Sequence, residues 1–252
     1  MPYAVTVTTP HSVRIEKLVA GGEGLTRLED GRVVFVPGVL AGELVEITLS
    51  EEKRDFGRGQ LLNILEPSAQ RREPPCPHVA QGCGGCDLQH ASIEHQRQIK
   101  FDIVYESLVR LGKIVDPDVR LYESAELPVV AARTTLRVAS ASQGVGFRQR
   151  RSHDVVPIER CLVAHPSLNE LLPTMRLDGA EEAVLRIGVA SGERMVWAEP
   201  QDSVSGITAE ILTSRNSSVH ELIDQHEFVV SAESFFQSSP QAAQALVDAT
   251  KR

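Results

Sequence analysis

All four cysteines of this 252-residue chain belong to one pattern, in which three lie close together and the fourth is remote. Cys76, Cys83 and Cys86 are spaced as Cys-x6-Cys-Gly-Gly-Cys, and Cys161 follows far downstream. Thiolates bind soft metals, so four that converge suit either a tetrahedral zinc ion or a cubane iron–sulfur cluster. Zinc sites more often contain two close pairs of ligands. The spacing therefore favours a cluster over zinc, and either metal over four unrelated buried cysteines.

The neighbours of these cysteines also favour a cluster. Gly82, Gly84 and Gly85 let the backbone approach the sulfur atoms and donate N–H groups to them. His78 and His90 are alternative ligands. A lone histidine near a metal loop, however, more often supports a ligand or faces solvent.

The cellular compartment bears on how these cysteines are read. No segment approaches the ~20 apolar residues of a membrane span, and residues 1–9 do not combine a basic segment with an apolar run as secretory signals do. The chain is therefore expected to be cytoplasmic, with no membrane partner. In that reducing compartment cysteines serve as ligands or thiols more often than as disulfides.

Charge is unevenly distributed along the chain. The net charge of −8 argues against nonspecific nucleic-acid binding by the chain as a whole. Residues 131–153, however, contain five arginines and no acidic residue, which fits either an RNA-facing surface or a solvated sheet face. The five are Arg133, Arg137, Arg148, Arg150 and Arg151.

The order of predicted elements indicates a multi-domain α+β protein. Residues 9–67 contain five strand patterns separated by turns such as Asp30-Gly31, which predicts a small OB-like barrel. A proline-rich connector follows at 67–77. Strand patterns then dominate from 129 to 230, with one short helix predicted over 166–175.

Two longer helices are predicted. The first covers about 93–111, where apolar residues recur at helical spacing and Gly112 can end the helix. Its apolar face consists of Phe101, Val104, Leu108 and Leu111. The second begins after Ser239, a suitable N-cap, with Pro240 at its first position.

Several motifs carry a family resemblance. The run Val-Arg-Ile-Glu-Lys-Leu-Val-Ala-Gly-Gly-Glu-Gly-Leu from Val13, with Asp30-Gly-Arg-Val-Val-Phe-Val-Pro-Gly, resembles a TRAM domain. The segments Cys76-Pro-His and Cys83-Gly-Gly-Cys-Asp-Leu-Gln-His are similar to the cluster region of iron–sulfur RNA uracil-C5 methyltransferases. Phe235-Phe-Gln resembles the start of that family's methyltransferase domain, although Ser238-Ser239 stands where the family has Val-Asn.

The resemblance implies a barrel, a cluster-bearing α/β central domain and a Rossmann-like domain that binds S-adenosylmethionine. It implies that Cys76, Cys83, Cys86 and Cys161 hold a [4Fe–4S] cluster and that Gln237 contacts S-adenosylmethionine. The expected domains are a TRAM barrel at 9–67 that binds RNA, an iron–sulfur loop at 68–92, a helix at 93–115 that packs on the methyltransferase domain, a β-rich central domain at 116–230, and the start of a truncated methyltransferase domain at 231–252.

The chain ends at Arg252, before the glycine-rich turn that should bind S-adenosylmethionine. The family's chemistry adds a cysteine thiolate to C6 of uracil, and the metal already occupies all four cysteines. No catalytic residue is therefore assigned, the nucleophile is expected beyond the end of the chain, and the chain alone is expected to be inactive. The apolar faces of its helices, left uncovered, are expected to make the chain prone to aggregation or unstable.

The leading interpretation is the RNA-recognition and [4Fe–4S] portion of a methyltransferase that acts on ribosomal or transfer RNA. The alternative is a stand-alone RNA-binding protein with a metal-stabilised fold and no catalysis, and a zinc protein with an OB-type barrel is a third possibility. The chain is expected to be a monomer. Phe56 and Phe147 are candidates for base stacking or for ordinary core packing. The predicted RNA contacts are Lys53, Arg58, Arg133, Arg137, Arg148, Arg150 and Arg151.

Overall fold

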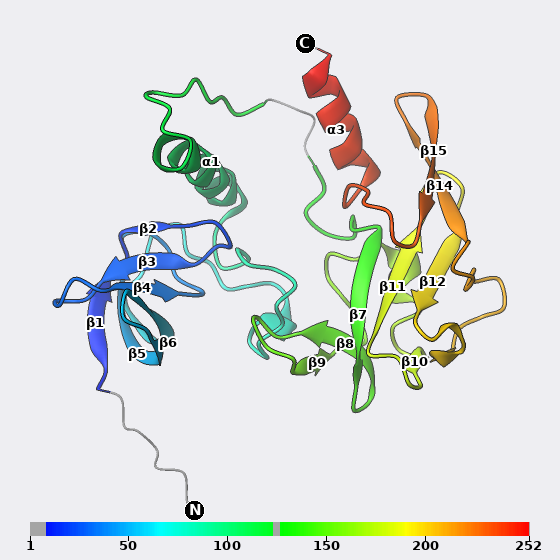
Figure 1. The fold of residues 1–252 in the computed structure, drawn as a ribbon, viewed down its shortest axis with the longest axis horizontal. Helices are drawn as coiled ribbons and strands as arrows, with labels where there is room; N and C mark the ends of the chain where they lie inside the picture. Colours follow the sequence, from blue (N-terminus) through cyan, green and yellow to red (C-terminus); the bar gives the residue numbers. More distant parts are fainter. Residues whose placement is uncertain (1–8, 123–126, 252) are drawn as a thin grey trace, which may run out of the picture. The chain divides into compact units, whose positions relative to one another are not determined.

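The computed structural model describes residues 9–122 and 127–251 (Figure 1). The chain divides into two compact units. The first contains the residues up to Pro75 and the segment Cys86–Leu121, and the second contains Cys76–Gly85 and the chain from Tyr122 onward. Within the described ranges, no helix has the length and apolar character needed to cross a membrane.

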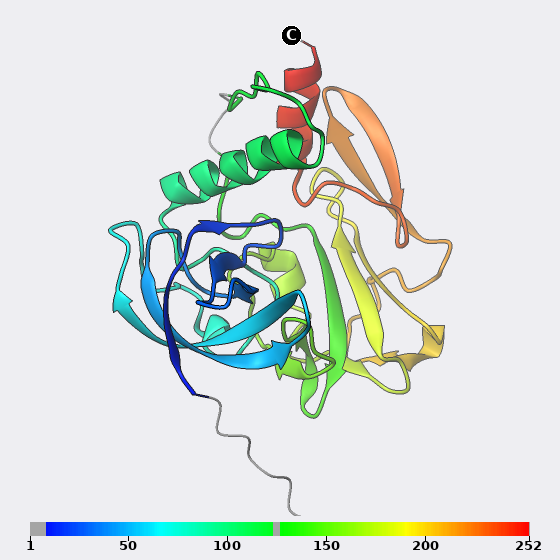
Figure 2. The ribbon, with the colours of Figure 1, turned by 60° about the vertical axis from the view of Figure 1, so that its left-hand side comes forward.

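A curved, six-stranded sheet forms most of the first unit (Figures 1 and 2). The strand order is β1-β5-β6-β4-β3-β2, and all neighbouring pairs are antiparallel except β4 and β6. Alternate residues of these strands point inward and build a core of Val, Ile and Leu side chains. The strands are β1 (His11–Arg14), β2 (Lys17–Leu18), β3 (Gly24–Arg27), β4 (Val33–Val36), β5 (Leu44–Glu52) and β6 (Phe56–Glu66).

The five predicted strands of this region are present, and the structure adds β2. The sequence gives little sign of β2 because it is only two residues long. The predicted hairpin at Asp30-Gly31 joins β3 to β4. Gly31 has a φ of +86°, a conformation that glycine adopts without the strain of a side chain.

Helix α1 (Ile93–Arg110) completes the first unit, and its bounds agree with the predicted helix. The Ser92 hydroxyl caps it by accepting a hydrogen bond from the His95 backbone N–H at 3.3 Å. The helix packs through Ile99 and Ile103 onto Leu18 and Leu40.

The residues that the sequence selected as the apolar face of α1 are not those that pack on the barrel. Val104 is 49% exposed and Leu111, just past the helix, is 83% exposed. Helical periodicity alone could not separate this stripe from the Ile99–Ile103 stripe beside it.

The second unit is built on a five-stranded antiparallel sheet of order β12-β11-β7-β8-β9. One face of this sheet carries the largest apolar core of the chain, which includes Leu136, Val138 and Leu185. Both predicted hairpins of this region are present, one between β7 and β8 and one between β11 and β12. The strands are β7 (Thr135–Ala141), β8 (Gly144–Arg148), β9 (Val155–Pro157), β11 (Glu182–Ile187) and β12 (Arg194–Ala198).

Shorter elements surround this sheet. The predicted helix over 166–175 was wrong in length, because α2 covers only Pro166–Asn169 and turns follow it. Pro173 disfavours helical backbone at Leu172 and has no N–H to donate to the preceding turn, so the helix cannot extend to residue 175. The other short elements of the second unit are the 3-10 turns η1 (Pro77–Val79) and η2 (Gln201–Ser203) and the strand pair β10 (Arg176–Leu177) and β13 (Val204–Ser205).

The C-terminal part of the second unit consists of a hairpin and a helix. Strands β14 (Ser218–Ile223) and β15 (His226–Ser231) are joined by Asp224 and Gln225, which both have positive φ, as tight hairpin turns require. Helix α3 (Pro240–Thr250) follows, and the Ser239 hydroxyl accepts a hydrogen bond from the Ala242 N–H at 3.1 Å. The predicted cap and first residue of this helix are therefore confirmed.

Candidate functional site

The first cysteine loop is organised by backbone hydrogen bonds around η1. The carbonyl of Cys76 accepts from the Val79 N–H at 3.2 Å, and the carbonyl of His78 accepts from the Cys83 N–H at 3.0 Å. The Cys76 Sγ lies 3.6 Å from Nδ1 of His78. The imidazole of His78 thus lies beside a predicted ligand, in the position of a supporting group.

The glycines of this loop allow it to lie directly on the end of β8. Cys83 forms a β-bridge with Gln149, and the Gly84 N–H donates to the carbonyl of Arg148 at 3.0 Å. A Cβ on Gly84 would lie 2.8 Å from that carbonyl oxygen, so only glycine fits here without a backbone shift. The predicted role of the glycines was approach to sulfur with N–H donation to it. At Gly84 the close approach is to the backbone of Arg148, which takes the Gly84 N–H, so donation to sulfur stays a prediction.

Cys161 lies in a second loop, between β9 and α2, and the side chain of Asn169 holds the backbone of Cys161 on both sides. The carboxamide of Asn169 accepts from the Cys161 N–H at 2.8 Å and donates to the Cys161 carbonyl at 2.9 Å. Cys161 and Cys83 both pack against the same apolar core of the second unit. Two loops that are far apart in sequence are thereby fixed to one core.

The four thiols are accessible in part. Each is partly exposed and, in the described ranges, none forms a disulfide. Cys76, Cys83 and Cys161 belong to the second unit, whereas Cys86, three residues after Cys83, falls in the first. Among the residues that the structure describes, no three His, Cys, Asp or Glu side chains are arranged to hold a single metal ion. The cluster therefore stays a prediction.

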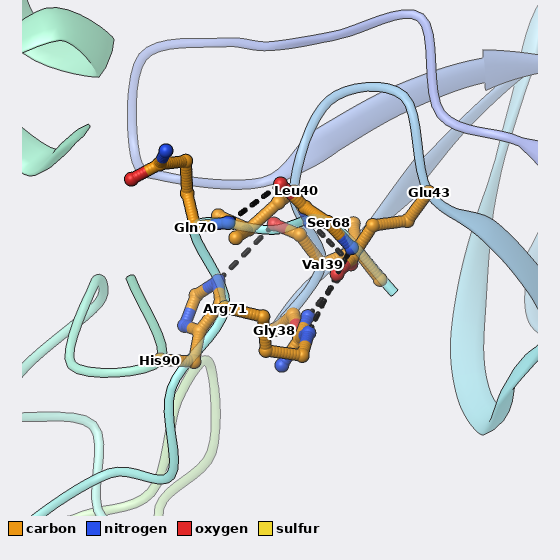
Figure 3. Close-up of polar contacts among 8 residues, drawn as sticks. All are labelled: Gly38, Val39, Leu40, Glu43, Ser68, Gln70, Arg71 and His90. Carbon is orange, nitrogen blue, oxygen red and sulfur yellow. Dashed lines mark hydrogen bonds and ion pairs between the residues drawn. The ribbon is translucent and has the colours of Figure 1, made fainter. Parts of the chain in front are cut away.

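The remaining histidine candidate, His90, has a structural role in the first unit. It is buried, and its Nε2 lies 3.1 Å from the carbonyl oxygen of Val39 (Figure 3).

Figure 3 shows a buried ion pair in the same region, which the sequence did not single out. Glu43 is completely buried, and Arg71 reaches it with Nε at 2.6 Å and Nη2 at 2.7 Å. The backbone N–H groups of Leu40 and Ser68 donate to the same carboxylate. Burial by itself raises the pKa of Glu43, but these hydrogen bonds outweigh it and hold the pKa below its usual range.

The predicted arginine stripe is partly neutralised by Glu182, the first residue of β11. Glu182 of β11 accepts from Arg148 at 2.7 Å and from Arg137 at 3.4 Å. The hydrogen bond from Arg148 is the main reason that the pKa of Glu182 lies below its usual range. Arg137 is nevertheless 69% exposed, which leaves its guanidinium accessible to a further anion. Arg133, at a bridge to Ala164, is half-buried, as is Arg150, whereas Arg151 is exposed.

The two predicted basic residues of the barrel surround a pair of aromatic rings. Phe35 and Phe56 meet edge to face with their centroids 6.0 Å apart. Lys53 Nζ lies 5.2 Å from the centre of the Phe56 ring, and the Arg58 guanidinium lies 5.8 Å from that of Phe35. Arg58 is also tied to Glu23 at 3.0 Å, so its charge is largely compensated. Phe147, by contrast, packs against the core of the second unit, as the core-packing alternative expects.

A cavity of about 310 Å³ lies on the face of the β7–β11 sheet opposite the core. Thr135 and Arg137 of β7 and Val184 and Arg186 of β11 line it on one side, and residues 232–236 line the other. Phe235, the first residue of the Phe-Phe-Gln motif, is 85% exposed, and Gln237 just beyond is half-buried. Arg186 was missed by the sequence reasoning. The signal was present, since this arginine interrupts the otherwise apolar run Ala-Val-Leu-Arg-Ile.

Comparisons with known proteins agree with this architecture. Residues 6–62 match the TRAM domain family. A protein of Streptomyces avermitilis described as an uncharacterized RNA methyltransferase is 32% identical over 95% of this chain and 62% of its own length. The 23S rRNA (uracil(1939)-C(5))-methyltransferase RlmD of Pectobacterium atrosepticum is 39% identical over 66% of this chain and 37% of its own length. The chain thus spans about three fifths or less of these curated relatives.

A solved structure has the same fold. The tRNA (uracil-54, C5)-methyltransferase of Pyrococcus abyssi, in complex with S-adenosyl-L-homocysteine, superimposes with a TM-score of 0.63 over 95% of this chain and 64% of its own. Its sequence is 19% identical, so this likeness concerns the fold alone. The chain therefore carries a TRAM domain at residues 6–62, and over nearly its whole length it is similar in sequence and in fold to RNA methyltransferases.

Proposed function

We propose that these residues form the RNA-recognition and [4Fe–4S] portion of an S-adenosylmethionine-dependent RNA uracil-C5 methyltransferase. The observation that carries the proposal is the 39% identity to a 23S rRNA uracil-C5 methyltransferase over 66% of the chain. The alternative of an RNA-binding protein without catalysis has no comparable support, because the curated relatives cited above are described as methyltransferases.

The residues present fit an iron–sulfur cluster. Cys76, Cys83 and Cys161 lie in loops that the protein itself fixes, and Cys86 is connected to Cys83 by only two glycines. The thiols are partly exposed and form no disulfide in the described part of the chain, and four cysteine sulfurs are the ligand set that a [4Fe–4S] cluster takes. A cluster bound by all four cysteines would connect the loop that contains Cys76, Cys83 and Cys86 to the loop that contains Cys161. We assign it that structural role in RNA recognition.

The barrel supplies one RNA-binding surface in this proposal. Lys53, between β5 and β6, lies beside the ring of Phe56 at the start of β6, and a partly exposed aromatic ring flanked by cations suits stacking on an unpaired base. Arg58 positions the two rings more than it binds phosphate, since Glu23 already accepts from it. In the second unit, Arg137, Arg150 and Arg151 are the arginines we assign to phosphate contacts, with Arg133 and Arg148 beside them.

For the methyl donor, the proposal assigns one residue of this chain. Gln237 directly follows Phe236, which lines the cavity described above, and would contact S-adenosylmethionine. That cofactor supplies the methyl group. The thiolate that attacks uracil is not assigned to any of the four cysteines, because a thiolate bound to iron cannot also act as a nucleophile.

Two measurements test the proposal. Protein purified without oxygen should be brown and contain about four iron and four sulfide per chain, and Cys161→Ser should lower both. Colourless protein with one zinc per chain would show that the four cysteines hold a zinc ion and not a cluster.

The second measurement addresses the reaction. Nucleoside mass spectrometry of ribosomal and transfer RNA should show that deleting the gene removes 5-methyluridine from one RNA, and that restoring the gene returns it. Unchanged methyluridine in both RNA classes would rule out the proposed activity.

A further inference from the structure

The backbone on both sides of the Cys161 thiol is held by one carboxamide, that of Asn169 at the end of α2. Asn169 Oδ1 accepts from the Cys161 N–H at 2.8 Å, and Nδ2 donates to the Cys161 carbonyl at 2.9 Å. Nδ2 also donates to the carbonyl of Ala164 at 3.3 Å. The carboxamide therefore fixes the two peptide groups that flank the Cys161 side chain, and with them the direction of that side chain.

The position of Asn169 is set by the helix that carries it. The Asn169 backbone N–H donates to the carbonyl of His165 at 3.1 Å, as in a helical turn. Its neighbour in α2, Leu168, is completely buried in the apolar core of the second unit. The Cys161 loop is thus tied to a point that the core holds in place.

The other three cysteines are held differently. Cys76 and Cys83 lie in a loop fixed by backbone hydrogen bonds, and Cys86 is separated from Cys83 by only two glycines. Ligands that are close in sequence stay near one another whatever the chain does elsewhere, because the loop between them is short. The fourth cysteine is remote in sequence, so the fold has to bring it to the other three. Its attachment is therefore the step at which a substitution can separate one ligand from the rest.

We propose that Asn169 is a positioning residue for the cluster, which keeps the Cys161 thiolate on its iron and protects that iron from oxidative loss. This role rests on the proposed function, in which the four cysteines hold a [4Fe–4S] cluster. Asn169 acts through the Cys161 backbone and does not itself bind iron. Groups that orient a metal ligand change metal affinity by about 10–100-fold when they are removed.

The loss of this contact should make one iron labile, and not the whole cluster. With its thiolate displaced, one iron of a [4Fe–4S]²⁺ cluster is held only by sulfides. A one-electron oxidant such as ferricyanide then takes an electron from the cluster, the bonds between that iron and its sulfides break, and the iron leaves as Fe²⁺. The sulfides and the other three thiolates remain as a [3Fe–4S]⁺ cluster, and the electron is found in ferrocyanide.

The test is iron release from the whole chain, purified without oxygen and then treated with ferricyanide. Asn169→Leu keeps the shape of the side chain but can neither accept nor donate. The matched control is Glu170→Ala at the next residue, which removes an ion pair with Arg194 at 2.9 Å in which Glu170 is 67% exposed. A chelator measures the released iron, sulfide analysis measures what is retained, and EPR detects a three-iron cluster. Trp197 fluorescence checks that the second unit is folded.

We expect Asn169→Leu to release about one iron per chain about tenfold faster than wild type, with its sulfide retained and the EPR signal of a three-iron cluster. Glu170→Ala should release iron within about twofold of the wild-type rate. Asn169→Asp keeps an acceptor for the Cys161 N–H but loses both donors, so it should also release iron faster than wild type. This variant keeps the test decisive if Asn169→Leu does not fold.

Equal rates for the Asn169 variants and the Glu170 control would overturn the proposal. Parallel loss of iron and sulfide in the Asn169 variants would also overturn it, because a residue that only supports the fold would expose the whole cluster. In both cases the wild-type chain still contains its cluster, so the proposed function survives. Wild-type protein without a cluster would remove both.

Discussion

The buried pair of Glu43 and Arg71 allows a quantitative prediction about the first unit. Glu43→Ala would remove a carboxylate that accepts four hydrogen bonds, two from Arg71 and one each from the backbone N–H groups of Leu40 and Ser68. Among the residues that the structure describes, the substitution would leave the largely buried Arg71 side chain with the Gly38 carbonyl as its remaining hydrogen-bond partner.

The expected loss of stability follows from what is left unpaired. Breaking a buried ion pair by removing one partner costs about 3–5 kcal/mol, because the other charge stays behind without compensation. Each backbone N–H group left without an acceptor adds about 1–3 kcal/mol unless water reaches it. Since Arg71 retains some exposure, we take the low end of each range and expect a total of about 5 kcal/mol, comparable with the ~5–15 kcal/mol that stabilises a typical domain.

Unfolding in urea is monitored by hydrogen exchange of peptides from β5 and β6. Fluorescence would not report on the first unit, because the single tryptophan lies in the second unit. Glu66→Ala is the matched control. It breaks a pair with Arg14 at 2.6 Å in which both side chains are more than half exposed, so it should cost no more than about 1 kcal/mol. A Glu43→Ala loss within about 1 kcal/mol of the Glu66→Ala loss would refute the reasoning.

Two further predictions concern the pH dependence of the Glu43 pair and the close approach of the backbone at Gly84. The folded-state pKa of Glu43 is depressed, so the stability that Glu43 contributes is present above the unfolded glutamate pKa and is lost as the pH falls through the folded pKa. Glu43→Gln should therefore reduce the fall of the urea unfolding midpoint at acid pH. An unchanged fall of the midpoint at acid pH would contradict the prediction. Gly84→Ala would place a Cβ 2.8 Å from the Arg148 carbonyl oxygen, whereas Gly85→Ala meets only the Cys83 sulfur at an ordinary 3.6 Å. Iron content should therefore fall much further in Gly84→Ala than in Gly85→Ala, and equal losses would count against a close approach at Gly84.

Much of the fold was predictable because local patterns and tertiary structure agree. The barrel strands, the two hairpins of the second unit, α1 and α3 all follow from alternation, turn glycines and capping serines. The failures have specific causes. Strand β2 is too short to show a pattern, and α2 is shorter than apolar spacing indicated, with Pro173 preventing any extension to residue 175.

The candidate sites were less predictable, because they depend on contacts between distant residues. The sequence identified the arginines of residues 131–153 but could not show that Glu182, on another strand, pairs with two of them. It likewise gave no sign that Glu43 and Arg71 meet, or that Asn169 holds the Cys161 loop. The cysteine spacing indicates a metal site, whereas the protein contacts that fix each loop appear only in the structure.

Those contacts lead to a last prediction, on removal of the metal. Small zinc domains unfold without their ion because binding of the metal supplies most of their folding free energy. Here Cys83 and Cys161 border a core of apolar side chains that exists without them, and Asn169 and the Gly84–Arg148 hydrogen bond hold the two loops independently. Iron-free protein should therefore keep its circular dichroism and its Trp197 fluorescence, and lose hydrogen-exchange protection only near residues 76–86 and 159–165. Cooperative loss of the Trp197 signal on iron removal would mean that the metal, and not the apolar core, holds the second unit together.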